Sequence, residues 1–250
     1  MGRILCIHGA WQGSWSWQRL VPLLEEAGFD VDAVDLPGNG SDDVPLGSVT
    51  LDLYVQHLRS RIHSAAGMHW LLAHSGAGVI ASQLAEALPQ RIAGIIYVAG
   101  IMLPSDVRFA ELVAEYMTVD RTASGIGPFL EWSKDLTVSR VPESAARHIF
   151  FHDVDPTTAD WAVRRLTPQP EGGRAVRPSL SAARFGSVRR IYIETIADRS
   201  VVHGLQRHMQ QVVPGAERLS LNTGHFPQLV APRQLAEMIR SQIHRNPDGC

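Results

Sequence analysis

Short apolar runs that alternate with amphipathic segments constrain the fold of this chain more than any other feature. Five runs, rich in β-branched residues or bounded by turn residues, predict buried strands, with a weaker sixth: 4–7, 31–34, 70–73, 95–98, 191–195 and 217–221. Segments with helical periodicity lie between and after them: 17–27, 51–64, 79–88, 201–212 and 233–244. This order predicts an α/β fold with a mostly parallel, doubly wound sheet of about six strands.

One long segment interrupts the alternation. Between about residues 103 and 184, strand-like runs disappear, and aromatic residues are scattered among polar, helix-compatible stretches. The prolines and glycines at 167–173 prevent a continuous helix there. We therefore expect one folding unit, in which residues 1–103 and 185–250 form the core and residues 104–184 form an inserted helical cap.

Charge and composition favour a small-molecule partner. The chain has 250 residues and a formal net charge of -2, without the basic surplus that nucleic acid or an anionic membrane surface would require. No apolar stretch approaches the ~18 residues of a membrane span, and the apolar run near the start is too short for a signal peptide. Cys6 and Cys250 are unsuited to a stabilising disulfide. We expect a cytoplasmic protein that is able to form a homodimer.

The segment around Ser75 resembles a nucleophile elbow. Ser75 follows a predicted strand and precedes a predicted helix, as the G-x-S-x-G motif requires, but Ala73 and Ala77 replace the outer glycines. Alanine is small enough for this tight turn. The turn would expose the Ser75 hydroxyl and leave the N–H of Gly76 available to an oxyanion. Ser75 is the predicted nucleophile.

His225 is the candidate general base among eleven histidines. It follows the last predicted strand and precedes the final helix, which places it on a loop at the carboxyl edge of the sheet. His74, beside Ser75, is expected to be structural and to point away from the nucleophile. His148 and His152 have the spacing of metal ligands on a helix but no convincing third ligand, so no metal or other cofactor is expected.

Asp198 is the candidate acid that orients His225. It lies in the loop after the fifth predicted strand, and the chain order Ser, Asp, His is that of α/β-hydrolases. Asp106, after the strand at 95–98, is the alternative. The second oxyanion donor is expected to be the N–H of Ala10, because Gly9 allows the backbone of the first strand-to-helix loop to approach the site.

These motifs together resemble one branch of the α/β-hydrolase superfamily: plant methyl esterases, including methyl salicylate esterases, hydroxynitrile lyases, and bacterial salicylate-esterase-like and pyrethroid-hydrolase-like proteins. The resemblance covers nearly the whole chain and is weakest in the cap. It rests on His8-Gly9-Ala10-Trp11 with Gly13-Ser14-Trp15-Ser16-Trp17, Asp35-Leu36-Pro37-Gly38-Asn39-Gly40, the Ser75 elbow, residues 185–193 with Asp198, and Gly224-His225.

The resemblance favours an esterase over a lyase. Where the lyases carry a threonine after the first histidine, this chain has Gly9, and where they carry a lysine after the catalytic histidine, it has Phe226. The expected activity is hydrolysis of a carboxylic ester or lactone of a small, partly apolar substrate through an acyl-enzyme. Lyase-like cleavage of a carbon–carbon bond and a low-turnover binding protein on the same fold are the alternatives.

Apolar side chains near the triad and in the cap are candidates for the substrate pocket. Core packing is the competing interpretation for each of them. The candidates are Trp11, Met102, Phe129, Trp132 and Phe226.

Overall fold

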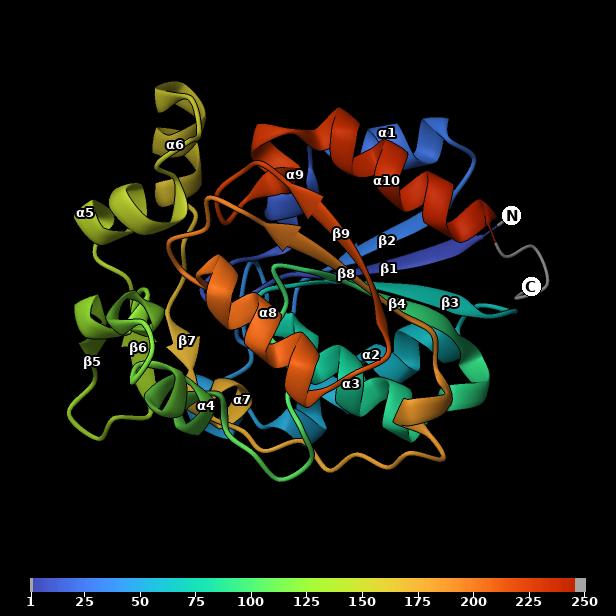
Figure 1. Ribbon diagram of the computed structural model, residues 1–250, viewed down its shortest axis with the longest axis horizontal. Helices are drawn as coiled ribbons and strands as arrows, with labels where there is room; N and C mark the ends of the chain where they lie inside the picture. The colour runs from blue at the N-terminus through green and yellow to red at the C-terminus, as the bar shows by residue number, and fades with distance from the viewer. Residues whose placement is uncertain (1, 246–250) are drawn as a thin grey trace.

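A six-stranded parallel sheet forms the centre of the molecule (Figure 1), as the computed structural model shows for residues 2–245. The strand order is β2-β1-β3-β4-β8-β9, with all five pairings parallel. The strands span Arg3–Ile7 (β1), Asp30–Val34 (β2), His69–His74 (β3), Ile92–Val98 (β4), Arg190–Thr195 (β8) and Ala216–Leu221 (β9). The structure thus confirms all six predicted strands and the α/β-hydrolase fold.

Helices cover both faces of the sheet because successive strand residues point to opposite sides. On one face, Leu72 and Ile96 pack against α1 and α10; on the other, Leu71 and Ile95 pack against α2, α3 and α8 (Figure 1). These helices span Val21–Glu26 (α1), Leu51–His63 (α2), Ala77–Ala87 (α3), His203–Val212 (α8) and Pro232–His244 (α10), with the short α9 at Pro227–Val230.

The first predicted helix is shorter than expected. Residues 17–27 were expected to form one helix, but the chain forms a 3-10 turn, η1 (Ser14–Trp17), and α1 begins at Val21. Pro22 lies in the first turn of α1, where its missing N–H leaves no intrahelical bond unmade. Two further 3-10 turns in the core are η2 (Leu46–Ser48) and η3 (Pro89–Arg91).

The inserted segment lies beyond the carboxyl ends of the strands, on the left in Figure 1. It contains α4 (Phe109–Tyr116), η4 (Arg121–Ser124), η5 (Gly127–Phe129), α5 (Glu143–Ala145), η6 (Ala146–Phe150, a π-helix), α6 (Pro156–Val163) and α7 (Glu171–Arg174). The inserted cap is mainly helical, as expected, but it also contains strands that were not expected. A three-stranded antiparallel sheet, β5 (Glu131–Trp132), β6 (Val138–Arg140) and β7 (Gln169–Pro170), joins its parts, and such short strands leave no periodicity in the sequence.

Residues 175–184 connect the cap to the core along α3. Gln83 on α3 bonds the backbone of Ser179 in both directions, and Glu86 accepts the N–H groups of Ser181 and Phe185. The chain then passes through η7 (Phe185–Ser187) into β8. Cys6 is buried in β1, and Cys250 lies outside the described residues. No helix within residues 2–245 has both the length and the apolar character needed to cross a bilayer.

Candidate active site

Ser75 lies in the sharp turn between β3 and α3. Its φ of 53° is in the left-handed region, which a residue with a side chain occupies only under strain. Backbone hydrogen bonds hold the turn on both sides: the N–H of Ser75 donates to Val98, and its carbonyl accepts from Ile101. Ala73 and Ala77 are fully buried around it. This packing explains why both positions carry small side chains.

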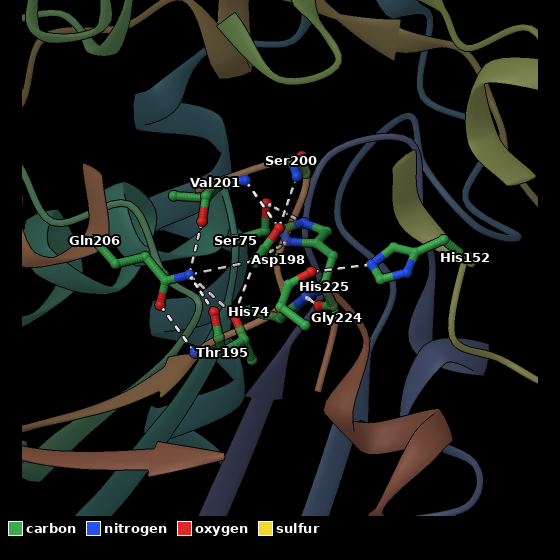
Figure 2. Close-up of polar contacts among 12 residues, drawn as sticks. His74, Ser75, His152, Thr195, Asp198, Ser200, Val201, Gln206, Gly224 and His225 are labelled. Atoms are coloured by element: carbon green, nitrogen blue, oxygen red, sulfur yellow. Dashed lines mark hydrogen bonds and ion pairs between the residues drawn. The ribbon is translucent and has the colours of Figure 1, made fainter. Parts of the chain in front are cut away.

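Ser75, His225 and Asp198 form one hydrogen-bonded chain (Figure 2). The Ser75 hydroxyl lies 3.1 Å from Nε2 of His225, and Nδ1 of the same ring lies 2.8 Å from Oδ2 of Asp198. The side chains of His225 and Asp198 are almost wholly buried. With a proton on Nδ1, Nε2 accepts the hydroxyl hydrogen of Ser75, the arrangement that general-base activation of a serine requires.

The loop after β8 fixes the Asp198 carboxylate. Oδ1 accepts the N–H groups of Ser200 and Val201, at 2.7 and 3.0 Å, and Oδ2 accepts the Thr195 hydroxyl at 2.9 Å. These donors hold Oδ2 toward the imidazole. Asp106, the alternative acid, lies on the exposed surface, where its backbone bonds Pro178 and Arg177.

Gln206 on α8 ties this loop together, and nothing in the sequence pattern marked it. Its buried Oε1 accepts the N–H of Thr195, while Nε2 donates to the carbonyl groups of Thr195 and Val201 and lies 3.4 Å from Oδ2 of Asp198 (Figure 2). One amide side chain therefore closes the turn that carries Asp198.

His74, which is buried beside Ser75, forms a hydrogen bond with the backbone of His225. Its Nε2 donates to the His225 carbonyl at 2.6 Å, and Nδ1 lies 3.1 Å from Oε1 of Gln12. Burial lowers the pKa of His74 well below its ordinary value, and the nearby His225 acts in the same direction. His74 is therefore a neutral, positioning histidine. Gln12, which sequence reasoning missed, also accepts the N–H of Gly9.

Two adjacent cap residues bond the backbone of the loops that carry His225 and Asp198. Asp153 accepts the N–H of Gly224, next to His225, and His152 donates to the carbonyl of Ala197, next to Asp198. A side chain at Gly224 would collide with both of these cap residues. His152 thus contacts the backbone instead of pairing with His148, and residues 2–245 contain no cluster of three potential metal ligands.

Ala10 and Gly76, whose N–H groups are the two expected oxyanion donors, lie next to each other beside Ser75. A Cβ atom built on Gly76 would lie 3.7 Å from the Ala10 nitrogen, and both residues line the same cavity as Ser75. Within residues 2–245, neither backbone N–H is used in a hydrogen bond. Gly9 packs so closely that an added Cβ would lie 2.9 Å from Cβ of Ser75. Both N–H groups therefore remain available to a ligand beside Ser75.

The loop that carries Ala10 is fastened from both sides. His8 donates from Nδ1 to the Gly9 carbonyl and accepts the N–H of Leu36 at Nε2; burial lowers its pKa, which keeps the ring neutral. Asp35 accepts the N–H of Ser14 at 2.6 Å and bonds Ser41 with its other oxygen. The polar contacts of His8 and Asp35 therefore fix the position of the Ala10 amide.

A cavity of about 400 Å³ lies between Ser75 and the cap. Its wall is mainly apolar and combines the elbow, the first loop, α4, the η4–η5 turns and α7. Among the predicted substrate-binding residues, Trp11 and Trp132 line it. The lining includes Ser75, Trp11, Arg108, Val113, Trp132 and Arg174.

The other three predicted pocket residues are not in this lining. Phe226 is fully buried and packs against His74, Phe150 and Phe151, while Met102 is buried in the core beneath the cap. Phe129 is 48% exposed on the outer surface of the cap. Adjacency to a catalytic residue gave Phe226 its place in the sequence prediction, but its ring is enclosed between His74 and the cap aromatics Phe150 and Phe151.

Comparison with known proteins assigns the chain to a class. Residues 4–238 match the family model described as "Alpha/beta hydrolase family", and the chain belongs to that family. This confirms the family resemblance seen in the sequence.

Individual relatives agree with this assignment. The chain is similar to Methylesterase 7 of Arabidopsis thaliana, with 29% identity over 249 residues, 95% of this chain and 94% of the relative. A solved structure of a pyrethroid hydrolase from Sphingobium faniae superposes with a TM-score of 0.87 at 25% identity, covering 100% and 99% of the two chains. The similarity to Putative methylesterase 13, chloroplastic, of A. thaliana is 26% over 95% of this chain, which spans 55% of that relative's length.

Proposed function

We propose that this protein is a carboxylesterase-type serine hydrolase, which cleaves a carboxylic ester or lactone of a small, partly apolar substrate through an acyl-enzyme. The observation that carries the proposal is the hydrogen-bonded chain Ser75–His225–Asp198 at the wall of an apolar cavity. The names of the similar proteins, methylesterase and pyrethroid hydrolase, support ester hydrolysis.

In the proposed reaction, Ser75, His225, Asp198 and the two backbone N–H groups act in both acylation and deacylation. Nε2 of His225 removes the proton of Ser75 as Oγ attacks the ester carbonyl carbon, and Asp198 stabilises the imidazolium that forms. The N–H groups of Ala10 and Gly76 bind the resulting oxyanion. Collapse breaks the bond to the alcohol, which leaves with the proton from His225. Water, activated by the same histidine, then releases the acid and restores Ser75.

The space around Gly9 supports hydrolysis over the lyase reaction. Hydroxynitrile lyases of the resembled branch carry a threonine at this position, but here a single added carbon would lie 2.9 Å from Cβ of Ser75 and 2.7 Å from the Gln12 amide nitrogen. The lyase lysine is also replaced, by Phe226, whose ring is buried. The threonine and lysine side chains that would stabilise a departing cyanide are therefore missing from these two positions.

The test is covalent labelling with a fluorophosphonate, followed by peptide mapping and by assays with short 4-nitrophenyl esters. We expect one adduct, on Ser75, and loss of at least about 10³-fold in kcat for Ser75→Ala and His225→Ala, because the triad acts as a unit. Ser60→Ala, on the exposed side of α2, is the matched control and should keep full activity. Labelling elsewhere, or undiminished hydrolysis by Ser75→Ala, would overturn the proposal; an adduct without turnover would indicate a binding protein.

A further inference from the structure

Two arginines and no carboxylate line the cavity, within the part of the chain that the structure describes. Apart from Arg108 and Arg174, the lining consists of apolar residues, glycines and serines. We propose that the cavity selects esters with a carboxylate at the end remote from the scissile bond, that is, half-esters of dicarboxylic acids with an apolar spacer. This inference rests on the proposed ester hydrolysis and names its substrate class.

The guanidinium of Arg174 is held in place by an ion pair with Glu171. Its Nε lies 2.9 and 2.8 Å from the two carboxylate oxygens of Glu171, and an Nη lies 2.8 Å from Oε2. Glu171 is itself buried and accepts the Ser139 hydroxyl, which in turn accepts the indole N–H of Trp11. Among residues 2–245, nothing accepts a hydrogen bond from Nη1 of Arg174. This nitrogen is available to a ligand.

Two indole rings set the orientation of the Arg174 guanidinium. Its central carbon lies 5.3 Å from the ring centroid of Trp11 and 5.8 Å from that of Trp132, within range of cation–π attraction. Both rings line the cavity. A planar guanidinium held in this way matches a carboxylate, which accepts parallel N–H donors, better than a neutral polar group. The indoles offer apolar surface to the spacer.

Arg108 supplies a second positive charge at the end of α4. Its side chain is exposed and forms no ion pair in the described chain, while the neighbouring Glu111 is paired with Arg177. The first two turns of α4 behind it, including Phe109 and Val113, belong to the cavity wall. The charge of Arg174 is offset by Glu171, but that of Arg108 is not. We therefore assign Arg174 to direct contact and Arg108 to attraction of the anion.

Two methyl esters that differ in charge alone test this assignment. Monomethyl terephthalate carries a carboxylate where methyl 4-carbamoylbenzoate carries an amide of nearly the same shape. We expect kcat/KM to be about tenfold or more higher for the anionic ester, because a charge-assisted hydrogen bond exceeds a neutral one. The preference should shrink as ionic strength rises from about 0.02 M to about 0.5 M, because salt screens the exposed charge of Arg108.

Variants identify the source of the preference. Glu171→Gln together with Arg174→Gln removes the pair without leaving a buried unpaired carboxylate, and should bring the anionic-to-neutral ratio of kcat/KM close to one. Arg108→Gln should lower the ratio a few-fold, and being exposed it should not affect folding. The matched control is Arg165→Gln, an exposed arginine stacked on Trp161 outside the cavity, which should leave the ratio unchanged.

Binding measured without turnover separates this inference from the proposed function. Calorimetry on Ser75→Ala should show tighter binding of monomethyl terephthalate than of the amide. If the wild type hydrolyses neither these two esters nor the 4-nitrophenyl esters, but Ser75→Ala keeps this preference, the hydrolase proposal fails and the anionic site stands. If both esters are hydrolysed with equal kcat/KM, if Ser75→Ala binds them equally, or if the ratio survives in a variant that combines Glu171→Gln, Arg174→Gln and Arg108→Gln, the anionic site is wrong.

Discussion

A side chain at Gly9 would displace the nucleophile or the loop beside it. An added Cβ would lie 2.9 Å from Cβ of Ser75 and 2.7 Å from Nε2 of Gln12, so the loop with the Ala10 amide has to shift. We expect Gly9→Ala to lower kcat by about 10²-fold, the usual cost of losing one oxyanion donor, with a smaller change in KM. Steady-state kinetics measure the effect. Gly47→Ala is the control, because nothing lies within 4 Å of the added atom; a kcat within twofold of wild type for Gly9→Ala would contradict the assignment of Ala10.

The sequence named the residues that now form the hydrogen-bonded chain, because Ser75, Asp198 and His225 each follow a strand in a fixed order. Motif and order carry that information along the chain. No motif predicts the contacts of Gln12, Gln206 and Asp153. Each of these side chains bonds groups that are remote in sequence or that lie within a turn. The pocket prediction failed for Phe226 for a related reason: a sequence neighbour of a catalytic residue can face either side of its loop.

Gln206 connects helix α8 to the candidate active site, because its side chain closes the loop after β8 that carries Asp198. Replacing it by leucine leaves the buried N–H of Thr195 and the carbonyl groups of Thr195 and Val201 without this partner. We expect Gln206→Leu to lower the free energy of unfolding by about 2–4 kcal/mol and to reduce kcat, because Asp198 loses its fixed position. Urea unfolding and kinetics test this. Gln211→Leu, exposed on the same helix, should change neither; equal stability of the two variants would refute the role of Gln206.

Asp35 gives the first loop a pH-dependent fastening. Burial raises the pKa of its carboxyl, but hydrogen bonds from Ser41 and Ser14 outweigh this, so the pKa lies below its ordinary value of 3.8. Because folding favours the ionised form, the contribution to stability is complete above the unfolded pKa and is lost as pH falls through the lower, folded pKa. Unfolding free energies measured below about pH 4.5 should therefore fall less steeply with pH for Asp35→Asn than for wild type. Parallel curves would show that Asp35 does not contribute.

Regular elements were predictable where their residues repeat a pattern. The core strands other than β9 contain short apolar runs, whereas β9 includes Glu217 and Arg218; α2, α3, α8 and α10 end within two residues of their expected limits. The strands β5 to β7 have two or three residues each, too few for a period, and their pairing is decided by contacts between distant parts of the cap. Pro22 moved the start of α1, which shows a local constraint overriding an apolar pattern.

At the scale of the whole molecule, the central sheet separates two layers of helices. One layer consists of α1 and α10, and the other, of α2, α3 and α8, lies on the opposite face. Leu72 is fully buried on the side of α1 and α10. We expect Leu72→Ala to lower the free energy of unfolding by about 2–5 kcal/mol through the lost contacts and the cavity left behind. Its kcat should match wild type at temperatures well below unfolding. Chemical denaturation and kinetics check both, with Leu136→Ala, 65% exposed on the cap, as the control; an unchanged stability would contradict the packing described.

The proposed nucleophile and base lie 150 positions apart, in the turn after β3 at the middle of the sheet and on the loop after its last strand. During synthesis, Ser75 leaves the ribosome long before His225 exists, so the growing chain passes through a stage with a serine and no base. In refolding from denaturant, tryptophan fluorescence reports formation of the core, while reactivity toward a fluorophosphonate begins only when β9 has docked beside β8. The rate at which covalent labelling of Ser75 appears therefore measures the final folding step, the docking of β9.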